Sequence, residues 1–224
     1  MAIIPKYHQF DCVEKNEPDD RQADAILKYR PDIIILEGPE REGKPDLIFN
    51  AYGPHEKPKK EIADVMDGLR IASKQFGYAV SDMKAFENVQ RLWNEGHNVL
   101  EYGVDGPKEL RSEFYEVWNH CYPCAKKNWL WWVHIYLRER IMANHMANIL
   151  KNYQDKPNPV ILIFLQSFHW KHVKFLLTNP TKEENWEYYF GSFPEVTPET
   201  IAEMIKRNNK VFYKYWMKYS DFKE

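Results

Sequence analysis

The sequence has few cysteines and no long hydrophobic run. Among its 224 residues are 3 cysteines, an odd number that cannot pair completely within one chain. So few cysteines, and a start without an apolar leader, favour a reducing compartment over a disulfide-rich secreted protein. The longest apolar run, residues 160–165, is far shorter than the roughly 20 residues of a membrane-spanning helix. We therefore expect a cytoplasmic protein with no membrane span.

An excess of charge of one sign is also missing. The chain has 31 basic and 33 acidic residues, and its formal net charge is -2. Such a balance gives no strong field toward nucleic acid, which is therefore not an expected partner. Hydrophobic residues make up 44% of the chain, enough to form a core, and this excludes an intrinsically disordered protein. The length fits a single globular domain, residues 1–224, and no solenoid repeat is visible.

Aromatic residues are abundant instead. The chain has 8 Trp, 14 Tyr and 12 Phe, rings that fill a core or line a concave pocket. The Trp-rich stretch 129–132 offers rings that can stack on bases or sugars, but without a basic groove core packing is favoured. We expect a small molecule or a peptide as the ligand.

Apolar runs that alternate with helical patterns predict an α/β fold with a central mixed, partly parallel sheet flanked by helices. Residues 33–36 and 160–165 are unbroken apolar runs, typical of strands buried on both faces. We predict shorter strands at 2–7 and 78–80, helices at 21–30, 61–76 and 167–177, and a mostly helical insertion at 83–155. An aromatic loop at 178–196 and a C-terminal helix at 197–219 should follow, with Thr197 as the cap of this helix and Pro198 in its first turn. The stretch 98–102 fits either a strand or part of a helical hairpin.

Four of the expected strands end in a residue that can bind a metal or transfer a proton. These residues are His8, Glu37, Asp82 and His169. In a parallel α/β sheet, ligands bind beyond the carboxyl ends of the strands, so we expect these four side chains to converge as catalytic residues. His8, Glu37 and His169 suit a divalent metal such as Mn or Zn. The same groups suit general acid–base hydrolysis without a metal, and both interpretations stay open.

Other patterns point less clearly to a site. Arg138 follows the aromatic stretch on a helix, where an arginine either snorkels to solvent or is held by a carboxylate or a ligand.

The segment GPEREGK at 38–44 lacks the Ser or Thr of a phosphate-binding loop. Cys121 and Cys124 form a single C-x-x-C, too few ligands for a zinc site unless His120 and the distant Cys12 join them.

A family pattern is carried by four segments, in order along residues 1–177: IIPKYHQF, KYRPDIIILEGPER, ADVMDGLRIASKQFGYAVSD, and RERIMANHMANILKNY followed by VILIFLQSFHWKH. They resemble the TraB/PrgY–Tiki family, within a wider group of erythromycin-esterase-like and ChaN-like proteins. The matching residues are His8, Glu37, Arg41, Asp82, Arg138, Glu139, Met142, Ala143 and His169. Pro5 and Gln166 stand where the family has glycines, and Met83 where it has an arginine.

The resemblance implies a hydrolase that cleaves a peptide or ester bond. Glu37 or Asp82 would be the general base, while Arg41, Arg138 and Glu139 would be the substrate-binding residues. An alternative is a non-catalytic module that binds a peptide, haem or another small molecule in the same cleft, which the replaced glycines favour. A third interpretation is a scaffold whose aromatic C-terminal region binds partners. The sequence leaves open whether the chain forms a homo-oligomer.

Overall fold

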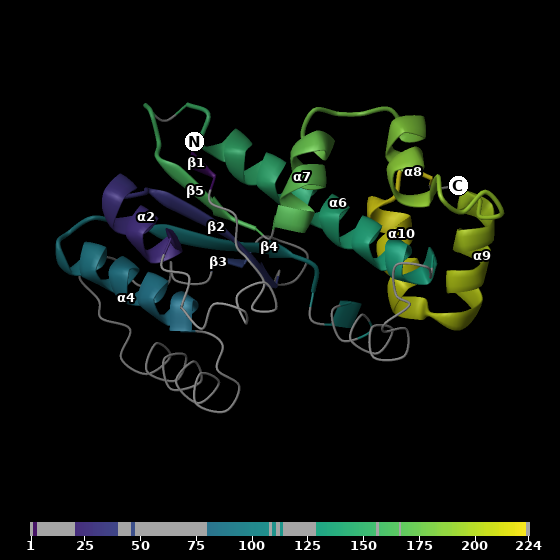
Figure 1. Cartoon of the computed structure of the whole chain (residues 1–224), viewed down its shortest axis with the longest axis horizontal. Helices are drawn as coiled ribbons and strands as arrows, with labels where there is room; N and C mark the ends of the chain where they lie inside the picture. The colour runs from purple at the N-terminus through teal and green to yellow at the C-terminus, as the bar shows by residue number, and fades with distance from the viewer. Residues whose placement is uncertain are drawn as a thin grey trace. The chain divides into compact units, whose positions relative to one another are not determined.

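The structure is a computed structural model, and it describes residues 2–3, 21–39, 46–47, 80–107, 109–110, 113, 129–155, 157–165 and 167–222 (Figure 1). Strands and helices alternate along these residues, so the predicted α/β class is confirmed. The contacts divide the chain into two compact units. The first contains 1–37, 47–103 and 153–170; the second contains 38–46, 104–152 and 171–224.

The first unit contains most of a sheet with the strand order β1-β5-β2-β4-β3. The strands are β1 (Ala2–Ile3), β2 (Ile33–Pro39), β3 (Asp46–Leu47), β4 (Leu100–Asp105) and β5 (Ile161–Phe164). Both β1 and β2 run parallel to β5, and Ile3 and Ile35 are each paired with Ile163. The parallel part of the sheet is thus confirmed. Because these three neighbouring strands point the same way, their carboxyl ends meet at one edge.

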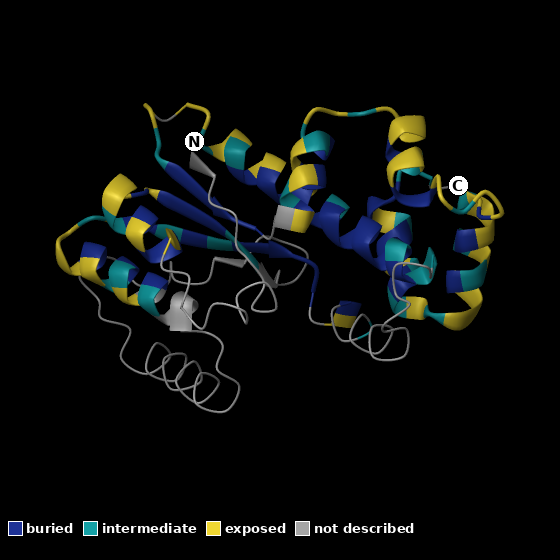
Figure 2. Ribbon diagram, in the orientation of Figure 1, coloured by how far each residue is buried: buried dark blue, intermediate teal, exposed yellow. Residues whose placement is uncertain are grey.

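The apolar runs of β2 and β5 are buried on both faces of the sheet (Figure 2). One face packs against helices α2 (Arg21–Tyr29) and α4 (Val80–Asn94), where Ile34 and Leu162 join their apolar side chains. The opposite face carries Ile35 and Ile163, each 0% exposed. A run without alternation is what a strand covered on both sides requires, since each side chain must be apolar.

Two elements between 78 and 105 differ from expectation. Helix α4 already begins at Val80, so Asp82 lies in its first turn and not directly at a strand end. Residues 78–79 and the helix predicted at 61–76 lie outside the described residues. The stretch 98–102, which fits either a strand or a helical hairpin by its sequence, contains the start of strand β4. This strand lies inside the range 83–155, which we predicted to be mostly helical. Its burial alternates at Leu100, Glu101 and Tyr102, as expected for side chains that point to opposite faces.

The second unit is helical and rich in aromatic side chains. It contains α6 (Trp129–Asn152), α8 (Lys182–Phe190), α9 (Pro198–Asn208) and α10 (Lys210–Tyr219), and α7 (Ser167–Leu176) ends in it. Its core contains Trp131, Tyr136, Tyr189, Phe190, Phe212 and Trp216 together with aliphatic side chains. Large rings therefore fill this core, as we expected for Trp131. Of the helices in the described part, none combines the length and apolar content of a membrane span.

The C-terminal helix is interrupted. Thr197 caps α9 by accepting a hydrogen bond from the backbone N–H of Thr200, and Pro198 occupies the first turn, as predicted. The helix ends at Asn208, because Asn209 is extended (φ -148, ψ 95). The Asn209 side chain then accepts a hydrogen bond from the N–H of Phe212 and so caps α10.

The loop predicted at 178–196 is wrong in its central part, which forms helix α8. A capping box starts this helix: Thr181 accepts from the N–H of Glu184, while the Glu184 carboxylate accepts from the N–H of Thr181. The aromatic residues of the predicted loop include Tyr189 and Phe190, which the helix buries in the core.

Candidate functional site

Two of the four residues predicted at strand ends lie side by side in the first unit. Glu37 is near the carboxyl end of β2, and His169 is in the first turn of α7, which follows β5. The distance between His169 Nε2 and Glu37 Oε1 is 3.8 Å, and the side chains are 3% and 9% exposed. Because β2 and β5 are parallel neighbours, both residues belong to the edge where an α/β sheet offers a ligand site.

The structure does not describe the side chains of the other site residues that we predicted at this edge. His8 and Arg41 lie outside the described residues, and for Asp82 only the backbone is described. The contact between Glu37 and His169 is therefore the part of the predicted constellation that the structure brings together.

The spacing of this pair is compatible with a shared metal ion. Ligand bonds of about 2.0–2.2 Å allow two donor atoms on one ion to lie up to about 4.4 Å apart. The observed 3.8 Å falls within this limit and exceeds the length of a direct hydrogen bond. A catalytic zinc site uses about three protein ligands. Within the described residues no group of three or more His, Cys, Asp or Glu side chains gathers around one point, so Glu37 and His169 by themselves fall short of such a ligand set.

A second glutamate–histidine pair is buried in the second unit. His172 Nδ1 lies 3.1 Å from Glu139 Oε2, and the Tyr189 hydroxyl donates to Glu139 and also contacts His172 Nδ1. Each of these three residues is at most 2% exposed. Burial and the neighbouring Glu139 carboxylate raise the pKa of Tyr189 well above its usual value, so the phenol stays protonated and can donate.

This cluster holds three helices together and has no access to solvent. Glu139 comes from α6, His172 from α7 and Tyr189 from α8. The His172 ring stacks on Tyr188 at 4.0 Å between centroids, and its Nε2 is buried without a hydrogen-bond partner in the described part of the chain. A carboxylate that orients an imidazole is typical of a general base. Here full burial favours a structural role.

Arg138 is held by a carboxylate, one of the alternatives that its sequence context left open. Its Nε and Nη2 donate to the two oxygens of Asp105 at 2.9 and 2.5 Å. The side chains are 8% and 0% exposed, and Asp105 also accepts from the N–H of Gly106 at 2.7 Å. The buried ion pair links α6 to the end of β4.

Sequence reasoning missed several buried polar groups. His172 follows His169 by three positions on a helix, a spacing that places both on one face and is visible in the sequence. Glu101 gives no such signal. It is 5% exposed, and its Oε2 is buried without a hydrogen-bond partner among the described residues. Burial raises the pKa of Glu101 to about 8.

Comparison of the chain with protein-family models, with curated proteins and with solved structures found no match. The resemblance to the TraB/PrgY–Tiki family therefore stays a prediction from the sequence.

Proposed function

We propose that the protein is a hydrolase that cleaves a peptide or ester bond, with Glu37 and His169 at the reacting centre. One observation carries the proposal: a carboxylate and an imidazole from distant parts of the sequence lie 3.8 Å apart at the carboxyl edge of parallel strands. This is where the ligands of α/β proteins bind. Both side chains are largely buried, so a reaction there would proceed with little bulk water around it.

Each group has a role in this mechanism. Glu37 takes a proton from a water molecule, which attacks the carbonyl carbon of the substrate. His169 gives a proton to the leaving nitrogen or oxygen as the bond to the carbonyl carbon breaks. Arg41, carried over from the family resemblance, would stabilise the negative charge that develops on the carbonyl oxygen. Because Arg138 and Glu139 are bonded to protein partners, the proposal does not depend on them.

A metal ion fits the same proposal. Glu37 and His169 would hold it, with His8 as the third ligand. Bound Mn or Zn supplies a Lewis acid that polarises the carbonyl group and makes water more acidic. Elemental analysis of freshly purified protein decides between this version and metal-free acid–base chemistry, whichever substrate is cleaved.

A non-catalytic binding module is the second candidate function. The observation that favours it is the replacement of both family glycines, by Pro5 and Gln166, next to the two histidines of the pattern. Under this proposal the same edge of the sheet holds a peptide, haem or another small molecule without cleaving it.

One set of assays distinguishes the hydrolase from the non-catalytic binding module. A panel of chromogenic esters and short peptides is tested with wild type, Glu37→Gln, His8→Ala and His169→Ala, each with and without added Mn or Zn. A hydrolase loses about 100-fold or more in kcat/KM in these variants. Glu87→Gln is the matched control, since Glu87 is exposed on α4.

Two other outcomes overturn hydrolysis. If no substrate is turned over, but a peptide or haem still raises the melting temperature of wild type and not of the His169→Ala variant, the module only binds. If the histidine variants match wild type in both assays, the edge of the sheet has no role in ligand chemistry.

A further inference from the structure

A polar hollow of about 430 Å³ lies in the second unit. Its volume is within the range of pockets that bind small molecules. Its lining comes from three helices and the chain after the last of them: Arg140 and Asn144 on α6, Lys182 on α8, Lys218 and Tyr219 on α10, then Ser220 and Asp221. It shares no residue with the edge that carries Glu37 and His169, so a ligand in this hollow does not depend on the proposed hydrolysis.

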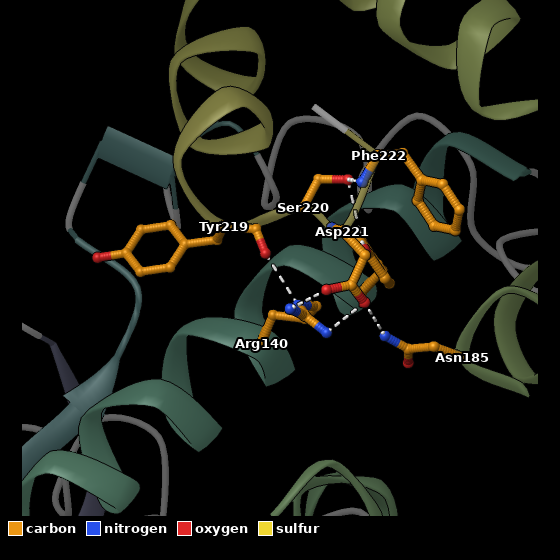
Figure 3. A network of polar contacts seen from close by, with 7 residues as sticks. Arg140, Asn185, Tyr219, Ser220, Asp221 and Phe222 are labelled. Atoms are coloured by element: carbon orange, nitrogen blue, oxygen red, sulfur yellow. Dashed lines mark hydrogen bonds and ion pairs between the residues drawn. The ribbon is translucent and has the colours of Figure 1, made fainter. Parts of the chain in front are cut away.

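One side of the hollow is held rigidly by a network around Arg140 (Figure 3). Arg140 donates from Nη1 and Nη2 to the two oxygens of Asp221, at 2.6 and 2.5 Å. Its Nε donates to the backbone carbonyl of Tyr219 at 2.8 Å. Asn185 donates a further bond to the Asp221 carboxylate at 2.8 Å, and the N–H of Asp221 donates to the Tyr136 hydroxyl at 3.1 Å. This wall is therefore formed before any ligand arrives.

The charges that remain in the hollow are positive. Arg140 and Asp221 neutralise each other, and no other acidic side chain among the described residues lines the hollow. Lys182 and Lys218 have no carboxylate partner within the described residues; Lys218 Nζ lies over the Tyr219 ring, 4.7 Å from its centroid. Two lysines thus line one polar hollow without a carboxylate partner from the described part of the chain.

We propose that this hollow binds a small phosphorylated ligand, whose phosphate group pairs with Lys182 and Lys218. A phosphate monoester carries a charge of about -1.5 to -2 at pH 7, which balances two ammonium groups. Lysine binds phosphate as a point charge. The amide nitrogen of Asn144 supplies a further donor, because its side-chain oxygen already accepts from Asn148 at 3.4 Å.

The state of Arg140 favours phosphate over a planar carboxylate. Bidentate recognition of a carboxylate uses the fork of an arginine. All three nitrogens of Arg140 are already bonded to Asp221 and to Tyr219. With one N–H of each nitrogen engaged, Arg140 has no free pair of parallel N–H groups to form such a fork. The other cationic groups at the hollow are the flexible ammonium groups of Lys182 and Lys218, which adapt to the tetrahedral oxygens of a phosphate.

The test measures binding of inorganic phosphate and of phenyl phosphate to the full chain by titration calorimetry and by thermal unfolding. Sodium chloride at matched ionic strength corrects for general screening. The variants are Lys182→Ala, Lys218→Ala and the double variant. Lys214→Ala is the matched control: Lys214 lies on the same helix, over the ring of Tyr215 at 5.3 Å, and does not line the hollow.

We expect saturable binding of both probes by wild type and by Lys214→Ala. Each single variant should weaken it about tenfold, or about 1.4 kcal/mol, and the double variant should abolish it. Circular dichroism shows whether the variants fold. The proposal is overturned if phosphate stabilises the protein no more than chloride does, if the folded double variant binds as wild type does, or if succinate binds as tightly as phenyl phosphate.

Discussion

The two glutamate–histidine pairs differ in what surrounds them. At the edge of the sheet in the first unit, Glu37 and His169 are 3.8 Å apart, too far for a direct hydrogen bond. In the helical second unit, Glu139 and His172 are in hydrogen-bond contact at 3.1 Å, and the Tyr189 hydroxyl completes the cluster. Similar residue types are thus in direct hydrogen-bond contact with each other in the second unit and not in the first.

The two arrangements of buried charged groups suit different roles, one in stability and one in ligand binding. Groups that are bonded to each other in a dry core contribute to stability, and removing one leaves its partner buried without compensation. Groups held near each other at a strand edge lie where a substrate or a metal can bind. We therefore expect mutations in the second unit to lower stability, and mutations of Glu37 and His169 to lower activity.

The largest loss of stability is expected for Asp105→Ala. It leaves the Arg138 guanidinium buried without its carboxylate, so the free energy of unfolding should fall by about 3–5 kcal/mol. Chemical denaturation measures this. Glu203→Ala is the control, because Glu203 and Arg207 form a pair with side chains 63% and 72% exposed, worth less than about 1 kcal/mol. Equal losses in both variants would contradict the structural role of the buried pair.

The second prediction is that the free energy of unfolding depends on pH through Glu101, which lies in the first unit. Glu101 is protonated in the folded state up to a pKa of about 8, whereas its ordinary value is 4.5. Between these values the unfolded chain binds fewer protons than the folded one, so stability falls as the pH rises. Glu101→Gln keeps a neutral side chain of the same shape. At pH 8.5 it should be more stable than wild type by on the order of 2–4 kcal/mol.

Denaturation of both proteins between pH 5 and pH 9 checks this prediction. The difference between wild type and Glu101→Gln should be small at pH 5 and should grow with pH. Parallel curves would show that Glu101 does not titrate in this range in the folded protein.

A smaller effect is expected for Tyr189→Phe. The ring stays in the aromatic core, but the hydrogen bond to Glu139 is lost, which should cost about 1–2 kcal/mol. Tyr188→Phe makes the same chemical change on the neighbouring residue, whose side chain is 43% exposed, and should change stability by less than about 0.5 kcal/mol. If the two variants unfold alike, the hydroxyl of Tyr189 does not stabilise the cluster.

The sequence predicted the parts of the fold that depend on local patterns. The runs at 33–36 and 160–165 contain the buried parts of strands β2 and β5, and Thr197 caps a helix. The convergence of Glu37 and His169 follows from a general rule on parallel strands, so it could be expected without coordinates.

What the sequence did not predict depends on partners distant along the chain. Asp105 binds Arg138 across 33 positions, and neither residue shows by itself that it is buried. Tyr189 looks like part of an aromatic loop until α8 brings it to Glu139. In the same way, the choice between strand and helix at 98–102 depends on whether a neighbouring strand is present, which no local pattern reveals.

The most direct test of the contrast between the two pairs measures kcat/KM and the melting temperature of His169→Ala and His172→Ala, on an ester or peptide that wild type cleaves. His169→Ala should lose about 100-fold or more in kcat/KM while it is folded. His172→Ala should melt at a lower temperature and, while folded, retain kcat/KM within a few-fold. A His169→Ala protein with wild-type kcat/KM would contradict the account.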